Sequence, residues 1–77
     1  MKMPRIAPVD WRVLVNVFFA VGFQIARQEE NHRSYTKRRI ARPVVIPVYD
    51  EVPVSIIRTN LKTAGISRDE YFRLLEK

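Results

Sequence analysis

The chain of 77 residues is long enough for one small domain over residues 1–77 and too short for two. It has no cysteine, which excludes disulfides and thiolate metal sites, and its hydrophobic share of 47% excludes a disordered chain. The formal net charge of +6 favours a polyanionic partner, that is, a nucleic acid, an anionic membrane or an acidic protein.

The first predicted element is a helix from Trp11 to Val21. Asp10 is expected to cap it, because a carboxylate there accepts hydrogen bonds from the free N–H groups of the first turn, and Gly22 supplies the left-handed residue that ends it. The helix is apolar nearly all round, which favours burial of a second face, either by another chain or by side chains elsewhere in this one. The expected partner surface consists of Val13, Val17, Phe19 and Ala20.

The apolar run at residues 13–23 also bears on localisation. It is too short to span a bilayer, and no small-x-small cleavage site of a signal peptide follows it. We therefore expect no membrane segment and a cytoplasmic protein.

An antiparallel meander of three strands is expected next. The predicted strands are residues 23–28, 32–37 and 44–48, joined by a tight turn at 29–31 and a basic hairpin tip at 37–41. The first strand alternates, with Phe23 and Ile25 on one face. The third should lie at a sheet edge, because Pro43 and Pro47 cannot donate to a ladder.

Two helices complete the chain. One is expected from Ser55 to Ala64, with Gly65 as its stop, and a capping box at residues 67–70 starts another that runs to the end. Helices packed on one face of an antiparallel sheet make an α+β fold. The other sheet face is expected to stay open to solvent or to a ligand.

A basic constellation surrounds the predicted hairpins, and it is the main candidate site. The chain has no phosphate-binding glycine-rich loop, no nucleophile elbow and no HExxH or CxxC motif, and its single histidine cannot build a zinc site by itself. Arg and Lys neutralise phosphates, and Tyr can stack on a base. The expected RNA-binding residues are Arg27, Gln28, Asn31, Arg33, Tyr35, Lys37, Arg38, Arg39 and Arg42.

His32 is the candidate catalytic residue, since histidine alone titrates near neutral pH without help. In RNA cleavage a base removes the 2′-OH proton, the ribose oxygen attacks the adjacent phosphorus, and nearby cations stabilise the transition state. No metal or cofactor is expected. Against this hypothesis, a turn histidine is usually an ordinary surface residue, Tyr35 can be a strand packing residue, and Glu29 and Glu30 repel phosphate.

Three motifs connect the chain to a known family: VGFQIARQEENH at residues 21–32, RPVVIPVYDEVPV at 42–54 and IIRTNLKTAGISRDEYFRLLEK at 56–77. With these motifs the chain resembles the HicA (YcfA-like) toxin family over nearly its whole length. The positions that carry the likeness, in order, are Gly22-Phe23, Arg27-Gln28, His32, Ile46-Pro47, Arg58, Ala64-Gly65-Ile66-Ser67 and Asp69-Glu70.

The resemblance implies a fold, an activity and a partner. The fold is double-stranded-RNA-binding-domain-like, α-β-β-β-α with a short extra C-terminal helix. The activity is that of the toxin of a type II HicBA toxin–antitoxin system, a metal-independent endoribonuclease that cleaves mRNA with His32 as general base. The partner is a HicB-like antitoxin, with which the toxin forms a hetero-oligomer.

Three residues at two sites depart from the family pattern. Glu30-Asn31 replace a Gly-Ser before the histidine, and Ile56 replaces a threonine at the helix start, which leaves any cap to Ser55. Glycine permits a positive-φ turn and close approach to a phosphate, whereas glutamate brings a like charge. The alternative hypothesis is therefore a catalytically weak or inactive RNA-binding or antitoxin-binding module of the same fold. A DNA-binding accessory is a third, which no helix-turn-helix spacing supports.

Overall fold

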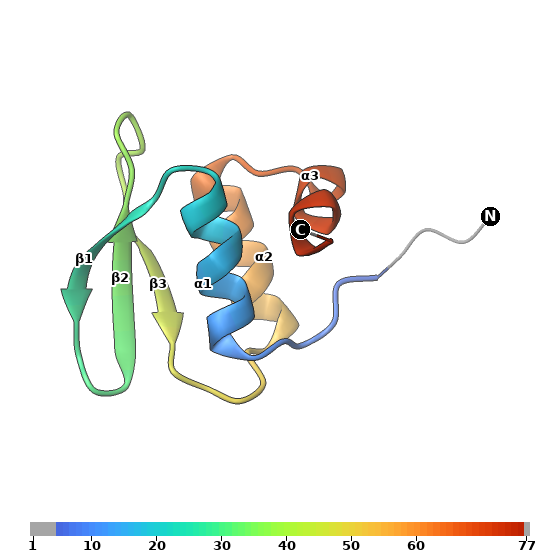
Figure 1. Ribbon diagram of the computed structural model, residues 1–77, viewed down its shortest axis with the longest axis horizontal. Helices are drawn as coiled ribbons and strands as arrows, with labels where there is room; N and C mark the ends of the chain where they lie inside the picture. Colours follow the sequence, from blue (N-terminus) through green and yellow to red (C-terminus); the bar gives the residue numbers. More distant parts are fainter. Residues whose placement is uncertain (1–4, 77) are drawn as a thin grey trace.

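A three-stranded antiparallel sheet and three helices make up residues 5–76, the part of the chain described by this computed structural model (Figure 1). The elements are α1 (Trp11–Ala20), β1 (Gln24–Gln28), β2 (His32–Thr36), β3 (Val44–Pro47), α2 (Val54–Ala64) and α3 (Arg68–Leu75). This order confirms the expected α+β class and the short extra C-terminal helix. Residues 1–4 and 77 of the expected domain lie outside the described part. None of the described helices is long and apolar enough to cross a membrane.

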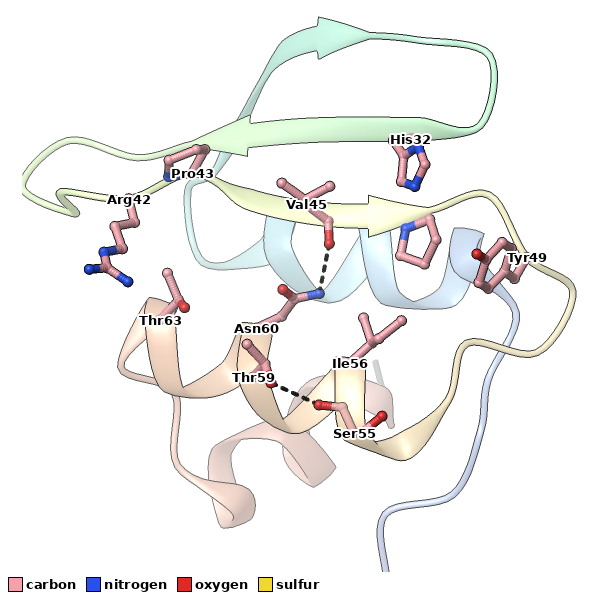
Figure 2. A pocket seen from close by; sticks show the side chains of 11 residues that line it. His32, Arg42, Pro43, Val45, Tyr49, Ser55, Ile56, Thr59, Asn60 and Thr63 are labelled. Atoms are coloured by element: carbon pink, nitrogen blue, oxygen red, sulfur yellow. Dashed lines mark hydrogen bonds between the residues drawn. The ribbon is translucent and has the colours of Figure 1, made fainter.

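Strand β2 is the centre of the sheet, with β1 and β3 antiparallel on either side. β3 is therefore an edge strand, as its prolines predicted, since Pro47 has no N–H to donate. Helix α2 packs alongside this strand, and the Asn60 side-chain amide donates a hydrogen bond of 3.1 Å to the Val45 carbonyl (Figure 2). A buried helix side chain thus satisfies a backbone group of the sheet edge.

Side chains of β2 and β3 alternate between the two faces of the sheet. The cross-strand pairs Tyr35–Val44 and Arg33–Ile46 point toward the helices, and Tyr35, Val44 and Ile46 are buried in the core. The intervening residues, His32 among them, point the other way. One face of the sheet is therefore packed, and the other is open at His32 and Val45, as expected, although Pro47 on that face is buried.

Strand β1 is the exposed edge on the other side. Its five residues are all exposed, and its pairing with β2 shifts register between Ile25 and Arg27. The regular alternation expected for residues 23–28 is therefore wrong, because a bulge interrupts it. Phe23 is buried, but no described helix makes extensive contact with β1, which leaves Ile25 exposed.

Helix α1 begins and ends through local interactions. Asp10 Oδ1 accepts a hydrogen bond of 2.9 Å from the Arg12 backbone N–H, which confirms the expected cap. The Arg12 guanidinium donates to the same carboxylate at 3.0 and 3.2 Å, and this hydrogen bonding lowers the pKa of Asp10. The helix ends at Ala20, one residue earlier than predicted, and Gly22 follows with φ 98°.

The later helix ends differ from the prediction at the start of α2, which is Val54 and not Ser55, and at the end of α3, which is Leu75. α2 stops at Gly65, with φ 71°, as expected, but its N-cap is Pro53, which makes no side-chain cap hydrogen bond. A cap by Ser55 is therefore wrong, since this residue lies within the first turn. Proline has no side-chain oxygen that could accept a hydrogen bond from the first turn. At α3, Ser67 Oγ accepts a hydrogen bond of 3.1 Å from Glu70 N, which is the forward half of the expected capping box.

The core joins the inner sheet face to all three helices. Phe18 and Phe23 meet edge to face, with ring centroids 5.3 Å apart, and Tyr71 of α3 is fully buried. Val17 is only 2% exposed, so its expected place at a partner surface is wrong. The reason is that α1 packs against α3 as well as against the sheet, so this chain covers the part of the helix that carries Val17.

Replacing Asn60 with alanine is expected to lower the free energy of unfolding by about 1–3 kcal/mol, because the Val45 carbonyl loses its donor. Urea unfolding of the purified chain measures this change. Lys62→Ala, at an exposed position on the same helix, is the matched control and should stay within about 0.5 kcal/mol of the parent. Equal losses in the two variants would contradict the assigned role of Asn60.

Candidate functional site

A groove of about 490 Å³ lies between β3 and α2 (Figure 2). Its lining residues are His32, Arg42, Pro43, Val45, Pro47 and Tyr49 on the sheet side and Ser55, Ile56, Thr59, Asn60 and Thr63 on the helix side. Figure 2 shows His32 and Tyr49 at one end and Arg42 at the other. The groove therefore has an imidazole and a guanidinium at opposite ends of one continuous surface.

His32 is the first residue of β2 and pairs with Pro47 of β3. Its side chain is exposed, while its carbonyl accepts a hydrogen bond of 2.9 Å from Glu29 N. On the other side of the turn, Asn31 O accepts a hydrogen bond of 2.9 Å from Val48 N. The backbone of His32 is thus held by both neighbouring strands, and its imidazole is free to reach a ligand.

The turn before His32 closes without glycine. Among residues 5–76, Arg39 is the only non-glycine residue with positive φ, so Glu30 and Asn31 both keep ordinary negative φ values. The left-handed conformation that glycine would permit is therefore not needed here. Glu30-Asn31 therefore closes the turn with ordinary backbone angles while adding a negative charge to it.

The expected cations do not converge on His32. Arg27 shares the open sheet face with it, because Arg27 pairs with Ser34, but its Nε lies 3.7 Å from Glu29 Oε1. Arg42 lines the far end of the groove. The basic hairpin tip lies at the end of β2 opposite His32, roughly 13 Å away along the strand (Figure 1). This tip carries Lys37, Arg38 and Arg39.

Arg33 and Gln28 lie on the face opposite to His32. They pair with each other across β1 and β2, and the Arg33 guanidinium carbon stands 4.6 Å from the centre of the Trp11 ring. Arg33 Nε is buried without a hydrogen-bond partner. The two expected RNA-binding residues therefore do not share a surface with His32, because alternation along β2 sends consecutive residues to opposite faces. Arg33 instead connects the sheet to α1 by a cation–π contact.

Tyr35 is a core residue and not a base platform. It is 1% exposed, and its ring meets Phe19 edge to face at 5.6 Å. Burial raises the pKa of its phenol. The expected stacking role is therefore wrong, because a base cannot reach a ring that the core encloses.

The helical wall of the groove and Tyr49 were missed from the sequence. Ser55, Thr59 and Thr63 recur every four residues, which places their hydroxyls on one side of α2. This spacing was visible in the sequence, but only the packing of α2 against β3 makes it a wall of the same site. Tyr49 is 46% exposed and lies two residues beyond the end of the edge strand.

The exposed apolar residues of α1 lie on two flanks of the helix, with Phe19 beside Ile25 of β1 and Val13 beside Leu74 and Leu75 of α3. Val13, Phe19 and Ala20, three of the four expected partner residues, are exposed. Ile25 of β1 is 41% exposed and lines a shallow pocket together with Phe19. These residues are distinct from those of the groove, which lies between β3 and α2.

Acidic residues and the histidine do not gather in space. Within the described residues 5–76, no three His, Cys, Asp or Glu side chains lie close enough together to hold a metal ion.

The fold and the groove define a small basic α+β protein with one histidine on the open face of its sheet. A family model described as the HicA toxin of bacterial toxin–antitoxin systems matches residues 11–66. Since the match covers more than half of the chain, the chain belongs to the HicA toxin family, and its α-β-β-β-α order is the double-stranded-RNA-binding-domain-like fold expected for that family. The matched range contains both walls of the groove. No curated protein shows a significant match.

Single alanine substitutions of Tyr35 and Tyr49 are expected to differ in their cost to stability, because one ring lies in the core and the other at the surface. Tyr35→Ala should cost about 3–5 kcal/mol of unfolding free energy, because it empties a closed core position. Tyr49→Ala should cost about 1 kcal/mol or less, since nearly half of the ring is exposed. Thermal unfolding followed by circular dichroism measures both, and similar losses would show that the two rings are misassigned.

Proposed function

We propose that this protein is the toxin of a type II toxin–antitoxin pair and cleaves mRNA in the cytoplasm with His32 as general base. The observation that carries the proposal is the position of His32 in a chain of the HicA toxin family. Its imidazole is exposed on the open sheet face, at the end of a groove that holds a cation at its other end.

The proposed reaction takes its nucleophile from the substrate. The His32 imidazole accepts the proton of a ribose 2′-OH, and the oxygen forms a bond to the adjacent phosphorus. The bond from that phosphorus to the 5′-oxygen of the next nucleotide breaks, and this oxygen takes up a proton. The products are a cyclic 2′,3′-phosphate and a 5′-hydroxyl, so the step needs no metal-activated water.

The proposed phosphate contacts divide into a near and a far set. Arg27 is on the same face as His32, opposite Ser34 in the register, and Asn31 is exposed in the adjoining turn. Farther along the strand, phosphates would meet the cations of the groove end and the hairpin tip. These are Lys37, Arg38, Arg39 and Arg42.

A second candidate function is a binding module that holds RNA or the antitoxin with little or no cleavage. The observation in its favour is the charge beside His32. Glu29 Oε1 lies 3.7 Å from Arg27 Nε and partly neutralises the positive charge of that arginine. Glu30 is exposed in the same turn. Both carboxylates oppose an approaching phosphate.

The proposed partner is a HicB-like antitoxin, and its proposed contact surface is the exposed apolar face of α1. Val13, Phe19 and Ala20 carry it, extended by Ile25 of β1. An apolar surface on a small charged domain favours a protein partner, and the net charge of +6 favours an acidic one.

Replacing His32 with alanine is expected to abolish growth arrest when the chain is expressed without an antitoxin. Cleavage of a purified RNA in the presence of a chelator should fall by at least about 100-fold, since a general base typically contributes that much or more. Circular dichroism of the variant should match the parent, because the side chain is exposed. Full toxicity and cleavage in a folded His32→Ala variant would contradict the catalytic role, and RNA binding without cleavage by the parent would favour the second candidate.

Replacing Arg42 with alanine is expected to weaken RNA binding and to reduce the slope of log affinity against log salt by about 1. Arg73→Ala, which removes the same charge from an exposed position on α3, is the matched control and should leave that slope unchanged. Fluorescence anisotropy with a labelled RNA at several salt concentrations measures both. An equal effect of the two substitutions would show that only total charge matters.

A further inference from the structure

We infer that the groove binds single-stranded RNA and that the Tyr49 ring stacks on one unpaired base beside His32. The inference rests on the proposed function, because it names the form of RNA that the same site takes. It is carried by the placement of an exposed aromatic ring and a histidine at one end of a groove with polar and apolar walls.

The backbone of Tyr49 is held firmly. Its N–H donates to the Pro47 carbonyl at 2.9 Å, the contact of a three-residue turn at the end of β3. Its carbonyl accepts a hydrogen bond of 3.0 Å from Trp11 N, one of the free N–H groups at the start of α1. The residue between them, Val48, donates to Asn31 O at 2.9 Å. A rigid backbone therefore presents a ring that is 46% exposed.

This ring stands close to the proposed catalytic group. His32 pairs with Pro47, two residues before Tyr49, and both side chains line the same end of the groove. A base stacked on the ring therefore holds its ribose near the imidazole. Positioning of this kind restricts the reacting 2′-OH and phosphorus to one geometry, which supplies much of an enzyme's rate.

The rest of the groove suits a strand with unpaired bases. Val45, 41% exposed, gives an apolar floor, while the hydroxyls of Ser55, Thr59 and Thr63 line the opposite wall. Arg42 at the far end supplies a charge for a phosphate. Apolar and aromatic surface for bases, together with polar groups and a cation for the backbone, is the pattern of single-strand recognition.

A duplex cannot use these features. In an A-form helix the bases are stacked on each other, so no base face is free to lie on Tyr49. Double-stranded RNA would meet the protein through its phosphates and 2′-hydroxyls alone. The domain therefore combines a double-stranded-RNA-binding-like fold with a groove for a single strand.

Binding of an uncleavable RNA tests the inference. The probe is a labelled 12-nucleotide RNA with 2′-fluoro groups, which lacks the nucleophile, used single-stranded or annealed to its complement, with the full chain. Tyr49→Ala should weaken single-strand binding by about tenfold, and Tyr49→Phe should bind within about twofold of the parent because it keeps the ring. Phe19→Ala, which removes an equally exposed ring from α1, is the control and should not change binding.

A second measurement changes the RNA and begins with the parent chain. Abasic sites placed at each position of the RNA in turn should weaken binding to the parent at one position, and this loss should disappear in Tyr49→Ala. Unchanged binding by a folded Tyr49→Ala, no abasic position that matters, or tighter binding of the duplex would each overturn the inference. Failure of the proposed function looks different: the parent would bind the single strand through Tyr49 and leave unmodified RNA uncleaved.

Discussion

Tyr35 is enclosed by the core. Because side chains alternate along a strand, its burial determines toward which face of the sheet each of the remaining residues of β2 points. Arg33 must face α1 with it, and His32 must face the open side of the sheet. A slip of one residue would exchange the two faces and bury the histidine. The candidate site therefore depends on a packing contact that takes no part in its chemistry.

The groove depends on a second contact, between α2 and the edge strand β3. An edge strand exposes backbone groups that attract other strands, and its prolines and Asn60 protect this one. With the amide of Asn60 on the Val45 carbonyl, α2 stands beside the sheet at a distance that leaves space for a ligand. The packing of α2 that protects the edge strand thus also forms the groove wall opposite His32.

The positive charge of the chain has several uses. Arg12 is hydrogen-bonded to the Asp10 cap, Arg33 lies on Trp11, and Arg27 contacts Glu29. These three arginines stabilise or neutralise local structure, so a net charge of +6 overstates what one surface offers to a phosphate. Arg42 lines the groove, and the cations of the hairpin tip lie beyond it. The phosphates of an RNA strand bound along β3 would therefore contact these cations at a distance from the proposed reaction.

The sequence by itself determined the features that depend on neighbouring residues: the Asp10 cap, the stops at Gly22 and Gly65, the order of elements and the edge position of β3. It also identified His32 as the candidate base, through motifs whose family the comparison confirms, although the base role itself remains a proposal. Tertiary structure alone decided which residues share a surface. It placed Val17 and Tyr35 in the core and Arg33 away from His32, and it brought Tyr49 and the α2 hydroxyls to the groove. The physical reason is that caps and turns act within a few residues, whereas a groove is made by elements that meet only when the core packs.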